Sequence, residues 1–168
     1  LQPYSASIYN ISAMSYGALS KTAISSLNKG AKLGNFAHNT GEGGISDFHL
    51  EGGDLIWQIG TGYFGCRKED GTFSAELFTE KANFPQVKMI ELKLSQGAKP
   101  GHGGLLPGEK NTVEIAKIRN VQPHIAVHSP AGHSAFTNSE ELLYFLQNLR
   151  KLSGGKPVGF KICIGRQD

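Results

Sequence analysis

Strand-like and helix-like segments alternate along most of this chain, and this alternation restricts the possible folds more than any other feature. Short apolar runs typical of strands occur at 8–14, 35–38, 87–95, 125–128 and 158–164. Strands that alternate with helices form mostly parallel sheets with right-handed crossovers. Such a sheet either stays open or closes into a (β/α)₈ barrel, and in both cases ligands bind at the carboxyl ends of the strands.

The helical segments begin at residues that can cap a helix. Ser20 precedes a helix that is predicted to run to about Leu33. Asn111 precedes a second helix, with Glu114 three residues further on at the capping-box spacing. Two more helices are predicted over 74–82 and 139–152, and the second of them has Asn138 or Ser139 as its cap.

Residues 54–73 interrupt the alternation. Two apolar runs, 55–59 and 63–67, flank Gly60-Thr61-Gly62, a pattern typical of a β-hairpin. We therefore expect a hairpin-like excursion from the main series of strands, within a single domain over residues 1–168.

Glycine-rich loops follow several of the predicted strands. Glycine accounts for 22 of the 168 residues, well above the ordinary usage of about 7%. The loop at 96–108 holds five glycines and two prolines, so it cannot form the interior of a helix or strand. Similar loops occur at 15–18, 39–44 and 129–133. Because all four would lie at one edge of a parallel sheet, they predict a functional site there.

Several classes of site lack their sequence signals. The chain has no P-loop, no dinucleotide-binding fingerprint before its first helix and no nucleophile elbow. Cys66 and Cys163 are far apart and belong to no metal-binding cluster. The spacing of His124, His128 and His133 does not bring the three rings to one ion. We therefore expect no metal site.

Charge and hydropathy argue against some kinds of partner. The net charge is +3, and the basic residues are scattered, which does not favour nucleic acid or a membrane surface. No run approaches the roughly 18 apolar residues that span a bilayer. The chain start lacks a signal-peptide pattern, and the sparse cysteines are typical of a reducing compartment. The expected location is the cytoplasm.

A flavin is the cofactor that these residues fit best. A flat ring needs close approach of the backbone, which the glycines and Ala13-Met14 allow. A lysine that extends from a strand can stabilise the negative charge of a reduced flavin. Lys161 lies within an apolar run, where a buried ammonium needs a charged partner. The other interpretation is a lysine that reaches the surface near a strand end.

Three longer motifs resemble those of one protein family. They are Ser-Ala-Met-Ser-Tyr-Gly-Ala-Leu-Ser at 12–20, Asn-Thr-Gly-Glu-Gly-Gly at 39–44 and Gln-Gly-Ala-Lys-Pro-Gly at 96–101. Together they resemble the FMN-binding synthase domain of glutamate synthases, and more closely the stand-alone glutamate-synthase-like FMN proteins of microbes. The resemblance covers residues 8–164. It implies a TIM barrel, of which this chain supplies about strands one to five.

The resemblance also implies an activity and roles for particular residues. The activity is that of an oxidoreductase of glutamate biosynthesis, which aminates 2-oxoglutarate with reducing equivalents from FMN. Glu42 and Lys99 would be catalytic, and Lys99 would hold the substrate carboxylate beside Gly43 and Gly104. The residues implied to contact FMN are Ala13, Met14, Ser15, Gln96 and Lys161.

Two positions depart from the family pattern. His102 stands where the family usually has glutamate, and Leu105 stands where a glutamine helps to hold the substrate. Another amino or keto acid is therefore the alternative substrate. The cysteine triplet that holds an iron–sulfur cluster in the family is absent from this sequence, so such a cluster is possible only in a longer protein.

The length of the chain limits what it can do alone. A complete (β/α)₈ barrel takes about 250 residues, against 168 here. We expect the isolated chain to be an incomplete barrel that binds FMN weakly, and a non-catalytic truncated fragment is the second alternative. An open sheet edge also predicts self-association. The electron donor is not indicated by any motif.

Overall fold

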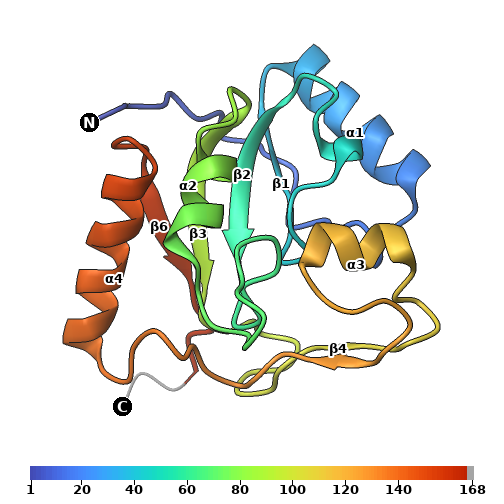
Figure 1. Cartoon of the computed structure of the whole chain (residues 1–168). Helices are drawn as coiled ribbons and strands as arrows, with labels where there is room; N and C mark the ends of the chain where they lie inside the picture. The colour runs from blue at the N-terminus through green and yellow to red at the C-terminus, as the bar shows by residue number, and fades with distance from the viewer. Residues whose placement is uncertain (166–168) are drawn as a thin grey trace.

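The computed structural model describes residues 1–165 and has a four-stranded parallel sheet at its centre. In Figure 1 the strands descend through the middle of the molecule, and their carboxyl ends lie along its lower edge. The strands, in their order across the sheet, are β1 (Ala37–Asn39), β2 (Asp54–Ile59), β3 (Val87–Lys93) and β6 (Val158–Lys161).

The predicted strand at 8–14 is an extended segment beside β1. Ile11 forms a single parallel bridge with His38, and the Ile11 N–H donates to the Ala37 carbonyl over 2.8 Å. Three residues later, the Met14 N–H donates to the Asn39 carbonyl over 3.0 Å. The segment therefore brings residues 13–15 to the carboxyl edge of the sheet.

Helices connect the parallel strands and cover one face of the sheet. The predicted caps Ser20 and Asn138 are confirmed, since each side chain accepts a backbone N–H in the first turn of its helix. In Figure 1, α4 lies beside β6 and α2 lies in front of β3. No helix in the described range is long and apolar enough to cross a bilayer. The connecting helices are α1 (Lys21–Gly34), α2 (Ala75–Ala82) and α4 (Ser139–Leu152).

The two faces of the sheet differ in polarity. Leu55, Trp57 and Leu92 are fully buried in the apolar core under the helices. Trp57 stacks on Phe78 of α2 with 5.2 Å between the ring centroids. Alternate residues face the other way, and those nearest the carboxyl ends of the central strands are polar, among them Gln58 of β2 and Glu91 of β3.

The prediction of a hairpin over 54–73 is wrong. Leu55–Ile59 lie in β2, a central strand that pairs in parallel with both β1 and β3. Residues 60–66 form two successive turns instead of a second strand, with Tyr63 at φ +49° and fully buried. Arg67 makes only a single antiparallel bridge, to Phe73. The second apolar run supplies core side chains rather than a strand, because Tyr63 and Cys66 pack under α2.

The strand predicted at 125–128 is not part of the parallel sheet. β5 (Val127–His128) pairs in antiparallel fashion with β4 (Leu105–Leu106) as a separate ribbon. This ribbon and α3 (Val113–Arg119) form an insertion between β3 and α4, which crosses the lower edge of the molecule in Figure 1. The insertion therefore lies over the carboxyl ends of the strands.

The cap of α3 also differs from the prediction. Thr112, not Asn111, accepts the backbone N–H of Ile115. Asn111 is buried, and its amide donates to the carbonyls of Gln122 and Ile125. Asn111 thus closes the loop that follows α3 instead of starting the helix.

Candidate active site

The loops at the carboxyl edge of the sheet surround a cavity of about 250 Å³. Its walls come from six separate stretches of chain and include Ser15, Glu42, Lys99, Gly104 and Arg119. A smaller space of about 20 Å³ shares Glu42, Lys99 and Gly104 with it. Its further lining residues include Lys93, Gln96 and His102.

Glu42 forms the best-defined ion pair of this edge. Lys93 Nζ lies 2.8 Å from Glu42 Oε1, and only 11% of the Lys93 side chain is exposed. The Glu42 carboxylate also packs against Gly60, where a Cβ atom would overlap it. The carboxylate is therefore held in one place, at the boundary between the sheet and the cavity.

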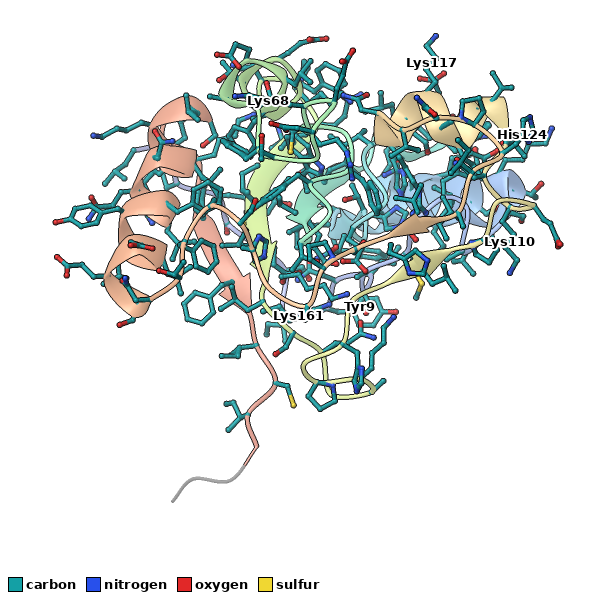
Figure 2. The ribbon with its side chains drawn as sticks, turned by 60° about the horizontal axis from the view of Figure 1, so that its bottom comes forward. Tyr9, Lys68, Lys110, Lys117, His124 and Lys161 are labelled. Atoms are coloured by element: carbon teal, nitrogen blue, oxygen red, sulfur yellow. The ribbon has the colours of Figure 1, made fainter. Side chains whose placement is uncertain are left out.

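Lys161 lies on the polar face of the sheet. It is the register partner of Lys93 across β3 and β6, and Figure 2 shows it near the centre of the edge that faces the viewer. Burial lowers the pKa of Lys161, and the charge of Glu91 opposes that shift. Within residues 1–165, Lys161 forms no salt bridge. This arrangement supports the interpretation of an inward lysine over that of a surface lysine.

Glu91 organises the polar face next to Lys161. Its Oε1 accepts hydrogen bonds from Asn39 Nδ2 at 2.9 Å and from Gln58 Nε2 at 2.5 Å. These two donors come from β1 and β2, so one carboxylate ties three strands together on this face.

Arg119 lines the cavity but belongs to none of the motifs that predict the site. Its side chain is only 8% exposed, and its guanidinium lies 5.0 Å from the centroid of the Phe64 ring. Nη2 donates to the Tyr16 carbonyl over 3.2 Å. Burial lowers the pKa of Arg119, and the charge of Glu42 opposes this. An arginine in the last turn of a helix is usually an exposed partner of the helix dipole, so only the fold reveals its place in the cavity.

Nε of Arg119 is buried without a hydrogen-bond partner among the described residues. A buried guanidinium nitrogen in this condition is costly unless a ligand supplies the missing acceptor.

The structure brings together some of the predicted site residues. Ser15, Glu42, Gln96, Lys99 and Gly104 all line the two spaces. Lys99 is exposed, and its Nζ lies 3.4 Å from the Gly103 carbonyl.

The other predicted residues lie behind this lining. Gly43 packs against Arg119 and Ser15, because a Cβ on Gly43 would lie 3.1 Å from each. Met14 is tied by its carbonyl to His49 Nε2 at 2.9 Å. Ala13, Met14, Gly43 and Lys161 are thus neighbours of the site rather than parts of the cavity wall.

The conserved region of glutamate synthase matches residues 5–168. The chain belongs to the glutamate synthase family. The family resemblance of the three loop motifs is therefore confirmed, and the loops that carry these motifs are those that meet at the cavity.

Relatives of this glutamate synthase family member differ widely in length. This chain is 48% identical over 159 residues to the glutamate synthase large subunit-like protein YerD of Bacillus subtilis, and the match covers 94% of this chain and 30% of that protein. It is 37% identical over 155 residues to the archaeal glutamate synthase (NADPH) of Methanocaldococcus jannaschii, covering 91% and 28%. It is 31% identical over 156 residues to the glutamate synthase (NADPH) large chain of Azospirillum brasilense, covering 89% and 9%. The chain therefore spans less than a third of these relatives.

The three histidines His124, His128 and His133 of this family member lie in different surroundings. His133 is buried, and its Nε2 donates to the Lys93 carbonyl over 2.8 Å. Tyr63 Oη lies 3.1 Å from His133 Nδ1, while His124 and His128 are exposed. Within residues 1–165, no cluster of histidine, cysteine and acidic side chains is arranged to hold a metal ion.

Proposed function

We propose that this chain forms the flavin-side and substrate-side walls of an oxidoreductase of the glutamate synthase type. The reaction is the reductive amination of 2-oxoglutarate or a related keto acid. The observation that carries the proposal is the cavity that is lined by a fixed carboxylate, Glu42, and by three cations, Lys99, Lys110 and Arg119.

The charges of the cavity favour an acidic substrate. Lys99, Lys110 and Arg119 outnumber the single carboxylate of Glu42 among its charged lining residues. A guanidinium binds a carboxylate through two parallel hydrogen bonds, and Arg119 lines this cavity. Glu42 can exchange a proton with the substrate nitrogen, because a positioned carboxyl group is a common general acid or base.

The polar face of the sheet fits an FMN ring. Lys161 is half-buried there without a salt bridge to the rest of residues 1–165, so it can meet the negative edge of a reduced flavin. Gln96 would contact the same edge, and Ala13, Met14 and Ser15 would lie beside the ring. When bound, FMN would supply the reducing equivalents for the imine of the keto acid.

The sheet itself supports the proposal of a barrel. The Ile11 segment, β1, β2, β3 and β6 lie side by side in chain order and all run in parallel. Helices cover only the apolar face of this sheet. A sheet of this kind corresponds to the first five strands of a (β/α)₈ barrel. We propose that residues 1–168 are one partial-barrel domain of this type, and that it acts in the cytoplasm, where its two free thiols stay reduced.

Leu105 favours a second candidate substrate. Its side chain is 60% exposed and lines the larger cavity together with Arg119. A leucine offers no hydrogen bond to a distal carboxylate. A keto acid with an apolar side chain is therefore the alternative to 2-oxoglutarate in the same reaction.

The proposal is tested on the complete protein. We expect the purified protein to show the visible absorption bands of an oxidised flavin, which disappear on anaerobic reduction. The bands should return when 2-oxoglutarate and ammonium are added, with glutamate as the product. A complete protein that binds no FMN, or whose reduced flavin reacts with no keto acid and ammonium, would contradict the proposal. Return of the bands with an apolar keto acid alone would support the second candidate.

A further inference from the structure

Both backbone polar groups of Met14 are fixed by other parts of the chain. Its N–H donates to the Asn39 carbonyl over 3.0 Å, and its carbonyl accepts from His49 Nε2 over 2.9 Å. The next residue, Ser15, lines the cavity. The hydrogen bond from His49 therefore holds the backbone of Met14 in place directly before Ser15, which lines the cavity.

The second nitrogen of His49 is also occupied. The Ser46 N–H points at His49 Nδ1 over 3.2 Å, and Ser46 Oγ lies 2.8 Å from the same atom. A backbone N–H can only donate, so Nδ1 carries no proton and Nε2 must carry one. The imidazole is thereby fixed in one tautomer, and it joins the turn at 46–49 to the Met14 carbonyl.

The surroundings of His49 keep it neutral. The ring is fully buried, and its centroid lies 5.3 Å from that of His38, which is also fully buried. Burial lowers the pKa of His49, opposed by the carbonyls of Met14 and Thr40. An apolar side chain would fill this space without burying two polar nitrogens. Packing alone thus does not account for a histidine here.

We infer that His49 is a positioning residue that holds residues 13–15 against the flavin ring through its hydrogen bond to the Met14 carbonyl. The inference rests on the proposed function, since it assumes that the ring lies beside this segment. His49 does not line the cavity, and its effect passes through the backbone of Met14.

Two variants of the complete protein separate the two hydrogen bonds of His49. His49→Asn places an amide oxygen near the position of Nδ1, so it keeps the bond from Ser46 but cannot reach Met14. His49→Gln places an amide nitrogen near the position of Nε2, so it keeps the bond to Met14. The first measurement is amide hydrogen exchange of residues 12–17 in protein stripped of flavin. We expect exchange about tenfold faster in His49→Asn and near the wild-type rate in His49→Gln, since one net hydrogen bond is lost.

The second measurement is the affinity for FMN, from quenching of flavin fluorescence. We expect the Kd to rise about tenfold in His49→Asn and to stay near the wild-type value in His49→Gln. Should His49→Asn not fold, His49→Leu replaces it, because leucine fills the buried space with an apolar side chain and has no N–H to donate to the Met14 carbonyl, so it should speed exchange in the same segment. Unchanged exchange at 12–17 would overturn the inference, as would equal effects of the Asn and Gln variants. Wild-type protein that binds no FMN would instead overturn the proposed function, while the exchange data would still decide whether His49 holds the segment.

Discussion

Lys93 donates a hydrogen bond from the end of β3 to the carboxylate of Glu42, 2.8 Å away. The backbone carbonyl of the same lysine accepts from His133 Nε2 over 2.8 Å. Lys93 is therefore held from both sides, by the loop after β1 and by the segment that precedes α4. The pair fixes the position of the one carboxylate that lines the cavity with Lys99 and Arg119.

Glu42→Gln should abolish most of the amination activity of the complete protein. The amide keeps the size of the side chain and can still accept from Lys93, but it cannot exchange a proton. We expect kcat to fall about 10²-fold or more, as for other general acids and bases, together with a lower melting temperature, because Lys93 loses its charged partner. Glu140→Gln on the exposed first turn of α4 is the matched control. A kcat within threefold of wild type would show that Glu42 has no role in proton transfer.

Arg119→Met should weaken binding of the keto acid more than it slows turnover. The variant removes the buried guanidinium and leaves an apolar chain over Phe64. We expect KM to rise about 10- to 100-fold, the range of a lost hydrogen bond to a charged group. Arg119→Lys should restore only part of this, because an ammonium cannot bind a carboxylate through two parallel bonds. Arg150→Met, on the exposed end of α4, is the control, and an unchanged KM in Arg119→Met would refute the assignment.

Leu105→Gln tests which substrate the cavity accepts. If 2-oxoglutarate is a poor substrate because Leu105 offers it no hydrogen bond, the variant should raise kcat/KM for 2-oxoglutarate about five- to tenfold. Turnover of an apolar keto acid should fall in the same variant. Leu143→Gln changes an equally exposed leucine on α4 and should alter neither value. No change in the ratio of the two substrates would mean that Leu105 does not select between them.

Stability should fall in mild acid because of His38. Burial lowers the pKa of His38 from 6.5 to about 4. Between these values the unfolded chain binds a proton that the native protein excludes, so the free energy of unfolding decreases as the pH falls through this window. The full effect is on the order of 3 kcal/mol. The free energy of unfolding, measured by urea unfolding at several values from pH 7 to pH 4, should decrease less steeply with falling pH in His38→Gln than in wild type. His102→Gln changes an exposed loop residue and should keep the wild-type dependence of stability on pH. The same pH dependence in His38→Gln and in wild type would exclude His38 as the cause.

Asn138→Ala should destabilise α4 without touching the site. The Asn138 side chain accepts the Glu141 N–H over 2.9 Å, and loss of such a cap costs about 1 kcal/mol. Since Phe145 and Leu149 of α4 are buried in the core, the loss should appear in global chemical unfolding. Asn148→Ala makes the same change at an exposed position of the same helix and should be neutral. Equal stability of the two variants would contradict the role of the cap.

The sequence by itself determined the helices and the edge of the sheet at which the site forms. Ser20 and Asn138 cap their helices as expected, because a cap depends on residues three or four positions apart in the chain. Glycine-rich loops after strands likewise indicated the carboxyl edge, where Glu42, Lys99 and Gly104 do meet. These features follow from local geometry, which neighbouring residues encode.

Only the tertiary structure decided which apolar runs become strands of the sheet and which side chains share the cavity. Leu55–Ile59 lie in the sheet and Val127–His128 do not, although both runs are short and apolar. Their pairing depends on partners far away in the chain. Arg119 enters the site because the insertion after β3 returns across the edge of the sheet. Such long-range contacts leave no periodic signal in the sequence, since burial and partner choice are properties of the packed chain.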